Sequence, residues 1–410
     1  MKFLKKFLIL FFIVLFSTYS FADDNLLVDD LDTFQIFETA NLLTEEPKTN
    51  SKNIIVLDRK TLSILYEKSP YQKVPMASTT KIMTCIIALE NANLNDIVTV
   101  SKNAASVQGS TLGLSTNMKI SMQDLLYGLM LRSGNDCAIA IAEYISGSLE
   151  NFATLMNQKA QDLKLLNTNF VTPHGLDDSN HFTTAYDLAM LTDYALKNSK
   201  FREIVSTKIC TISLNNSPRT ISNTNELLGN LEGVYGVKTG FTFGAGRCLV
   251  SSCKRGNLDI IVVVLGADTK KIRTQDSSNL IKYVFGTYKY VNVQNTIESA
   301  FNDYIHYFNK HVILEKTTII PKLKLQKLDN YDFPLKTNGD VKLHTKIYMI
   351  NKFSPNILTN SKVGTLQLYN NNNNNNNELL CKTDIILENT LSKNSWSYYF
   401  HNILKSLSNF

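Results

Sequence analysis

The stretch Pro75-Met76-Ala77-Ser78-Thr79-Thr80-Lys81 places a serine and a lysine one helical turn apart, directly before an apolar run. Two further short motifs follow it along the chain, Ser133-Gly134-Asn135 and Lys238-Thr239-Gly240. A nucleophilic serine needs a base, a proton relay and an anchor for its substrate, and these motifs supply candidates for all three. A Ser-x-x-Lys alone is weak evidence, because such a pattern also arises by chance. Three motifs in this order favour one active site over three unrelated surface turns.

The first motif leads into a predicted buried helix, since apolar side chains fall on most of its faces at Ile82, Met83, Ile86, Ile87 and Leu89. Ser78 would lie at the N-terminal end of this helix, where the partial positive charge favours a developing alkoxide. Lys81 shares its helix face. Lys81 can act as the base only if burial or a second cation lowers its pKa, and Lys238 is the candidate for that cation.

The remaining motif residues receive roles from their chemistry. Ser133 is suited to pass a proton between Lys81 and the leaving amine, and Asn135 offers an amide to hold a substrate peptide bond. Thr239 can bind a carboxylate, while Gly240 leaves room for close approach of a backbone. The edge of the strand that carries them could pair with an extended peptide.

An oxyanion hole needs two backbone N–H groups, and those of Ser78 and Phe241 are the natural pair.

Periodicity along the chain predicts an α+β domain over residues 46–288. The apolar runs 54–57 and 62–66 flank a turn and indicate a β-hairpin. Asp136 is expected to cap the helix that follows the second motif. Further strands are expected at 234–238, 247–253 and 258–265, and further helices at 125–131, 138–145, 152–165, 184–196 and 277–285.

Residues 291–390 have a different pattern of apolar and polar residues, which predicts a small all-β domain. Apolar and polar residues alternate over 341–349, and shorter strand-like runs occur at 317–323 and 363–368. The asparagine run 370–377 is of low complexity and is expected to be a loop insertion without chemistry of its own.

The N-terminus has the pattern of a secretory signal. Positive residues precede an unbroken apolar run over 7–16, and small residues end it, so cleavage is expected after residue 22. An uncleaved anchor is the alternative, but a bilayer takes about 20 apolar residues. A polar linker over 23–45 follows, and the mature chain is expected to be exported.

Residues 391–410 predict an amphipathic helix with aromatic and basic residues and no acid. Such a helix suits a membrane surface. The alternative is a terminal helix that docks on the β domain.

Composition narrows the function classes. The chain of 410 residues has a formal net charge of +6, which is only mildly basic, and it lacks aromatic-basic repeats and zinc-finger spacing, so no nucleic-acid partner is expected. No metal-ligand cluster and no cofactor motif is recognised, so no metal or cofactor is expected. The cysteines are expected to be buried free thiols, because no C-x-x-C spacing occurs among Cys85, Cys137, Cys210, Cys248, Cys253 and Cys381.

With these motifs in place, the chain resembles the low-molecular-mass penicillin-binding proteins of the serine D-alanyl-D-alanine carboxypeptidase type. The resemblance covers nearly the whole chain. Its matching segments are 75–81 (PMASTTK), 132–136 (RSGND), 174–177 (HGLD), 184–189 (TAYDLA), 223–228 (NTNELL), 236–242 (GVKTGFT) and 245–249 (AGRCL). Arg273 falls where the family has an arginine that helps to bind the substrate's terminal carboxylate. Tyr235 departs from the pattern, which commonly has Asp there.

The resemblance implies a β-lactamase/transpeptidase-like catalytic domain, with an antiparallel sheet and helices, that hydrolyses the bond between two D-alanines of a peptidoglycan stem peptide. Ser78 would form the acyl-enzyme, and β-lactams would acylate the same serine. The family is held by its terminal helix on the outer face of the cytoplasmic membrane. His174 and Asp177 are interpreted as structural, with His174 as a catalytic base the less favoured alternative.

Three other functions stay open at this stage. A class A β-lactamase shares the motifs but usually has Ser-Asp-Asn and a deacylating Glu. A non-catalytic penicillin-binding protein would not need the intact serine and lysines. Transpeptidase or endopeptidase activity on cross-linked stems would use the same acyl-enzyme.

Overall fold

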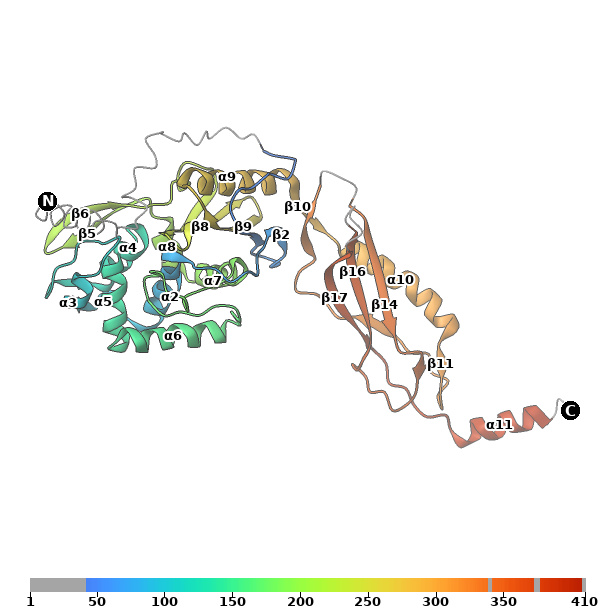
Figure 1. The fold of residues 1–410 in the computed structure, drawn as a ribbon. Coiled ribbons are helices and arrows are strands. Elements are labelled where there is room, and N and C mark those ends of the chain that lie inside the picture. Colours follow the sequence, from blue (N-terminus) through green and yellow to red (C-terminus); the bar gives the residue numbers. More distant parts are fainter. Residues whose placement is uncertain (1–41, 338–340, 372–376, 408–410) are drawn as a thin grey trace, which may run out of the picture. The chain divides into compact units, whose positions relative to one another are not determined.

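The structure is a computed structural model that describes residues 42–337, 341–371 and 377–407. It divides into two compact units, one ending at Thr287 and the other beginning at Tyr288 (Figure 1). The boundary lies close to the one expected from the sequence. The predicted signal peptide 1–22 and nearly all of the predicted linker 23–45 lie outside the described residues.

An antiparallel sheet in the order β2-β1-β9-β8-β7 forms the centre of the first unit. Its strands are β1 Asn53–Asp58, β2 Ile64–Lys68, β7 Val234–Thr242, β8 Gly246–Arg255 and β9 Leu258–Ala267. The predicted hairpin of β1 and β2 is confirmed, and β1 also pairs with β9. Every residue of β1 is buried, because the strand lies inside the sheet and is covered on both faces. β7 is an edge strand, and it carries the third motif.

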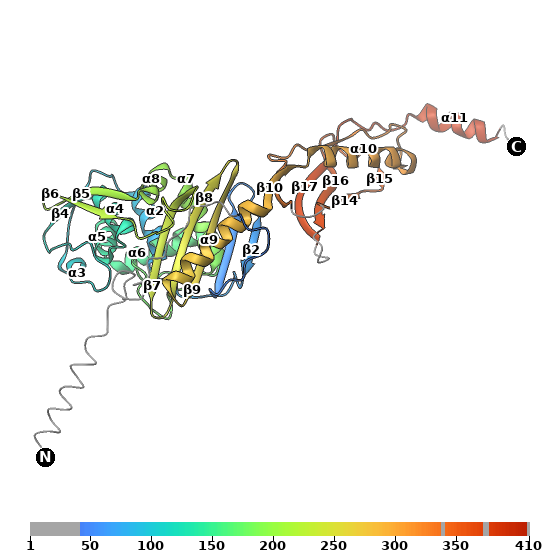
Figure 2. The same ribbon diagram turned by 90° about the horizontal axis from the view of Figure 1, so that it is seen from above.

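Helices cover both faces of this sheet (Figures 1 and 2). One face carries α9 Lys270–Thr287, which contacts β8 and β9, and the other carries the larger helical layer. That layer contains α2 Lys81–Asn91, α4 Met122–Leu131, α5 Asn135–Ser146, α6 Leu149–Asp162, α7 Ala185–Lys197 and α8 Ser199–Ser206. Helix α2 is buried from Lys81 to Ala88, as its sequence predicts. Shorter elements are η1 Ala77–Thr80, β3 Ile97–Thr99, α3 Lys102–Ala105, β4 Lys119–Ser121, β5 Ile209–Leu214 and β6 Ser217–Ser222.

The prediction that Asp136 caps α5 is wrong. Gly134 is the N-cap, and Asp136 lies in the first turn. Its carboxylate accepts hydrogen bonds from the backbone N–H groups of Leu112, Gly113 and Leu114 at 2.9, 2.9 and 3.0 Å. A buried loop without its own secondary structure must find acceptors for its N–H groups, and this carboxylate provides them.

All six cysteines are free thiols. Four are buried as expected, whereas Cys210 and Cys381 are half-buried.

The second unit is built on an antiparallel sheet in the order β12-β17-β16-β14. Its elements are β10 Tyr288–Asn292, α10 Gln294–His311, β11 Ile313–Leu314, β12 Leu323–Leu325, β13 Asp332–Lys336, β14 Leu343–Met349, β15 Lys352–Phe353, β16 Lys362–Asn371 and β17 Asn377–Leu387. The β-rich interpretation is correct for the sheet, but the domain is not all-β. Helix α10 was missed, although Ile297, Phe301 and Phe308 recur at helical spacing and are buried.

Two other expectations for this unit need correction. The run 317–323 forms a strand only at its last residue, where β12 begins. The asparagine run lies between β16 and β17, and its outer residues extend these two strands. Residues 372–376 of the run lie outside the described residues.

The terminal helix is α11, Trp396–Leu407, and it begins later than expected. Leu391 is only 2 % exposed and belongs to the core of the second unit, because the chain still packs on the sheet there. By contrast, no residue of α11 is buried, and Trp396 is 85 % exposed. Across the described ranges, no helix is both long and apolar enough to cross a membrane.

Candidate active site

Ser78 lies in η1, a short 3₁₀ turn directly before α2. Two threonines of the motif hold this turn. Thr79 Oγ1 donates to Met76 O at 2.5 Å, and Thr80 Oγ1 donates to Ala77 O at 2.8 Å. The turn places Ser78 Oγ 2.7 Å from Lys81 Nζ, so the predicted pairing of the two motif residues is present.

Lys81 is fully buried, and its amine lies among three oxygens. Besides Ser78 Oγ, these are Asn135 Oδ1 at 2.8 Å and His174 O at 2.9 Å. The amide and carbonyl oxygens can only accept, whereas the serine hydroxyl can also donate. The amine can therefore donate to the amide and carbonyl oxygens while it exchanges a proton with the Ser78 hydroxyl.

The loop between α4 and α5 supplies the second motif. Asn135 is buried, and its amide nitrogen donates to Gln108 O at 2.7 Å while its oxygen accepts from Lys81. Asn135 therefore orients Lys81, whereas its motif alone indicated a contact with the substrate peptide. Ser133 is 6 % exposed, and within the described part of the chain its side chain makes no hydrogen bond. Among the residues that the structure describes, no hydrogen bond joins Ser133 directly to Lys81.

The third motif lies on β7 beside η1, the predicted nucleophile turn that carries Ser78. A Cβ atom at Gly240 would lie 3.0 Å from Ser78 N and 3.1 Å from Thr79 N, so only glycine lets this strand approach so closely. Lys238 is buried, and its amine donates to Thr239 O at 2.9 Å. The backbone of Phe241 follows Gly240 directly. The predicted pair of oxyanion donors, Ser78 and Phe241, thus lies on adjoining segments.

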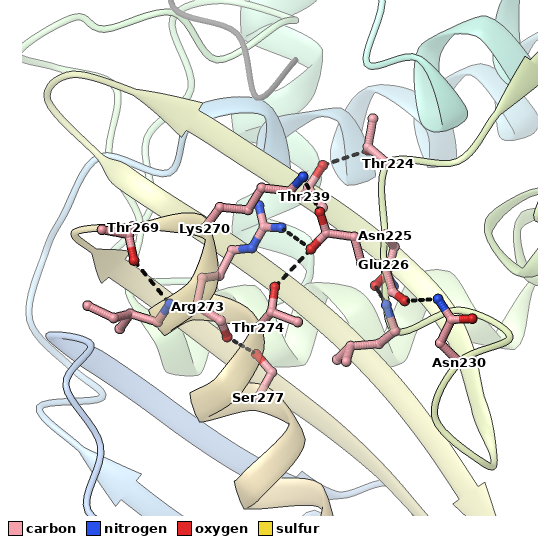
Figure 3. A network of polar contacts seen from close by, with 12 residues as sticks. Thr224, Asn225, Glu226, Asn230, Thr239, Thr269, Lys270, Arg273, Thr274 and Ser277 are labelled. Carbon is pink, nitrogen blue, oxygen red and sulfur yellow. Dashed lines mark hydrogen bonds and ion pairs between the residues drawn. The ribbon is translucent and has the colours of Figure 1, made fainter. Parts of the chain in front are cut away.

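Arg273 lies near the start of α9, where its side chain is fully buried. Its Nη2 donates to Glu226 Oε2 at 3.2 Å (Figure 3). Glu226 also pairs with Lys270 and accepts from Thr274 Oγ1 at 2.9 Å. The arginine expected to bind a substrate carboxylate is therefore already engaged by an acid of this chain. Glu226 was not recognised as a site residue, although it lies within the matched segment 223–228.

The loop that carries His174 packs against the turn that carries Ser78, because Gly175 lies beside Ala77 O and Thr80 Oγ1. His174 contributes its backbone oxygen to Lys81, while its ring Nδ1 accepts from Leu176 N at 3.2 Å. Burial, with smaller effects of Lys81 and His181, lowers the pKa of His174 to about 3. The imidazole is therefore neutral at physiological pH and already accepts a hydrogen bond from its own loop, which agrees with the structural interpretation.

Asp177, in the same loop, binds the turn after β7. Its carboxylate accepts from Thr242 Oγ1 at 2.5 Å and from Gly244 N at 3.0 Å. It thereby holds the end of the motif strand, which also agrees with a structural role.

Comparison with known proteins agrees with this site. Residues 40–269 match the family model of D-alanyl-D-alanine carboxypeptidases of the S11 peptidases. The chain is 31 % identical over 342 residues to D-alanyl-D-alanine carboxypeptidase DacF of Bacillus subtilis, covering 79 % of this chain and 83 % of the relative. It is 37 % identical over 268 residues to D-alanyl-D-alanine carboxypeptidase DacC of Escherichia coli, covering 60 % of this chain and 64 % of the relative.

Solved structures show the same fold. The Streptomyces K15 DD-transpeptidase superposes with a TM-score of 0.56 at 32 % identity, over 59 % of this chain and 99 % of that one. The carboxypeptidase DacD of Francisella tularensis gives a TM-score of 0.66 at 24 % identity, over 86 % of this chain and 96 % of that one. The family match favours a carboxypeptidase over the class A β-lactamase that shares the motifs. The chain therefore belongs to the D-alanyl-D-alanine carboxypeptidase family of serine peptidases.

Proposed function

We propose that the protein is a serine DD-carboxypeptidase that removes the terminal D-alanine from peptidoglycan stem pentapeptides. The observation that carries the proposal is the position of Lys81 Nζ, 2.7 Å from Ser78 Oγ and held by two obligate acceptors. This is the geometry of a serine with an adjacent general base. Membership of the D-alanyl-D-alanine carboxypeptidase family supports peptides that end in D-Ala-D-Ala as the substrate class.

In the first step, Ser78 Oγ attacks the carbonyl carbon of the bond between the two D-alanines while Lys81 takes its proton. The carbonyl oxygen becomes an oxyanion, which the N–H groups of Ser78 and Phe241 stabilise. The tetrahedral intermediate collapses when the C–N bond breaks and the leaving amine receives a proton, relayed from Lys81 through Ser133. D-Alanine leaves, and the shortened peptide stays as an ester on Ser78.

In the second step, water attacks the ester carbonyl while Lys81 accepts its proton. The C–O bond to Ser78 breaks, and the proton returns to Ser78 Oγ. A β-lactam would acylate Ser78 through the first step, because its amide carbonyl takes the place of the peptide carbonyl. Its amine stays attached to the acyl group, so it does not diffuse away as D-alanine does.

The proposed location is the outer face of the cytoplasmic membrane. Export rests on the signal-like sequence of residues 1–22. Anchoring rests on α11, whose large side chains at Trp396, Phe400, Ile403 and Leu407 are 55 % to 85 % exposed and thus available to a lipid surface. Lys393 and Lys405 add positive charge beside them. In this location the enzyme would control how many stem peptides remain available for cross-linking.

The test is release of D-alanine from a peptide ending in D-Ala-D-Ala, with a Ser78→Ala variant alongside. Release by the wild type alone supports the proposal. If no D-alanine is released while a fluorescent penicillin still labels Ser78, the protein is a penicillin-binding protein without carboxypeptidase activity. Absence of both release and labelling would refute the active site itself.

Transpeptidation is a second candidate, because the structurally similar Streptomyces K15 protein is a DD-transpeptidase. The acyl-enzyme is the same, and an amine replaces water in the second step. Addition of a glycyl or D-amino acid acceptor to the D-alanine assay separates the two. A ligated product that forms faster than the hydrolysed one would favour transpeptidation.

A further inference from the structure

We propose that Glu226 and Lys270 set the local charge around Arg273, where the substrate's terminal carboxylate is expected to bind. Glu226 weakens this binding, and Lys270 strengthens it. This inference rests on the proposed function. Neither residue belongs to the three motifs. Both lie around Arg273, the residue expected to meet that carboxylate (Figure 3).

The side chains on the two faces of β7 point toward different parts of the first unit. Lys238 and Gly240 pair across the sheet with Val250 and Cys248, which belong to the core under the helical layer. Gly240 accordingly faces the nucleophile turn. Because side chains alternate along a strand, Thr239 points to the opposite face, which is the one that α9 covers. The first residue of α9 is Lys270, and Arg273 lies one turn later.

A short segment connects Thr239 to the charged groups of α9. Thr224 Oγ1 lies 2.7 Å from Thr239 Oγ1, and Asn225 Nδ2 donates to Gly236 O at 2.8 Å. Glu226, the next residue, pairs with Lys270 and Arg273. Two residues span at most about 7 Å of chain. The cluster of Glu226, Lys270 and Arg273 therefore lies within one or two side-chain lengths of Thr239.

The formal charges of the cluster leave one positive charge in excess, since Arg273 and Lys270 carry two and Glu226 neutralises one. Arg273 is fully buried, whereas the side chains of Lys270 and Glu226 are 29 % and 32 % exposed. A carboxylate that reaches Arg273 therefore competes with the Glu226 carboxylate, and Lys270 compensates for part of that repulsion. Such charges act over several ångströms and are weakened by salt.

The experiment compares Glu226→Gln and Lys270→Gln with the wild type. Glutamine at 226 keeps an acceptor for Thr274 and Arg273 but removes the charge. Lys271→Gln is the matched control, because it removes the same charge from the neighbouring residue, which is exposed and turned about 100° around the helix. The rate constant of Ser78 acylation is measured with benzylpenicillin and with its methyl ester, at low and at high salt. The kcat and KM for a D-Ala-D-Ala peptide are measured beside it.

At low salt, we expect Glu226→Gln to accelerate the acylation of Ser78 by benzylpenicillin roughly three- to tenfold. We expect Lys270→Gln to slow it by a similar factor. For the peptide, the change is in KM rather than kcat. The methyl ester and Lys271→Gln show changes below twofold, and high salt reduces all effects.

Equal changes for penicillin and its ester would overturn the proposal, because they indicate that the cluster only supports the fold. Slower acylation in Glu226→Gln would also overturn it. If the wild type is acylated but releases no D-alanine, the proposed function fails while the penicillin comparison still decides the role of the two charges.

Discussion

Substitution of Gly175 by alanine should disable the nucleophile turn without removing any catalytic group. Gly175 has a φ of +89°, and a Cβ atom there would lie 1.9 Å from Ala77 O and 2.6 Å from Thr80 Oγ1. Carbon and oxygen need at least about 3.2 Å, so one of the two segments must move by more than about 1 Å. The residue before it, His174, supplies the carbonyl that holds Lys81 at 2.9 Å.

A displacement of this size sets the expected magnitude. Misplacement of a catalytic group by about 1 Å can reduce a rate about a hundredfold. The second-order rate constant of Ser78 acylation by a fluorescent penicillin should therefore fall about a hundredfold in Gly175→Ala. Thermal unfolding, followed by circular dichroism, should show a folded but destabilised protein.

The control variant Gly147→Ala separates the steric clash expected at position 175 from the backbone strain of a non-glycine residue with positive φ. Gly147 has a φ of +76° at the end of α5, and a Cβ atom there would meet nothing within 4 Å. Gly147→Ala should cost about 1–2 kcal/mol of stability through left-handed strain and leave the acylation rate unchanged. Wild-type acylation by a folded Gly175→Ala protein would refute the reasoning.

Three further predictions follow from buried groups and the terminal helix. Burial lowers the pKa of His181 to about 4, so this residue stays neutral in the folded protein while the unfolded chain protonates it below about 6.5. The free energy of unfolding should therefore decrease as the pH falls from about 6.5 toward about 4, by up to about 1.4 kcal/mol per pH unit. In His181→Gln, the denaturant midpoint should depend less steeply on pH over this range. Asp136→Ala removes the acceptor of four backbone N–H donors, those of Leu112, Gly113, Leu114 and Cys137. It should cost at least about 3 kcal/mol of unfolding free energy, measured by urea denaturation, and a cost below about 1 kcal/mol would contradict this. Deletion of residues 395–410 should release the protein from anionic lipid vesicles in a sedimentation assay, and continued sedimentation would exclude α11 as the anchor.

Much of the catalytic domain could be predicted because its signals are local. A serine and a lysine one turn apart, followed by an apolar helix, describe η1 and α2 without knowledge of distant contacts. Alternating or continuous apolar runs bounded by turns likewise identify β1, β2, β8 and β9. Gly240 was expected to leave room at the strand edge, and the structure adds that a Cβ atom there would lie 3.0 Å from Ser78 N.

What the sequence could not indicate depends on contacts between distant segments. Asp136 resembles a helix cap, but three of its partners are N–H groups of a loop more than twenty residues earlier. His174 draws attention as a histidine, yet its contribution to the site is a backbone oxygen, which no residue type announces. Glu226 and Arg273 form a pair only because the strands between them fold the chain back.

The central claim is that Lys81 activates Ser78 for acylation, and the mass of the trapped acyl-enzyme tests it most directly. The intact protein is incubated with a penicillin and weighed, then digested to locate the adduct, for the wild type, Ser78→Ala and Lys81→Met. The account predicts one adduct on Ser78 of the wild type, none on Ser78→Ala, and at least about a hundredfold slower labelling of Lys81→Met. An adduct on another residue, or rapid labelling of Ser78 without Lys81, would contradict it.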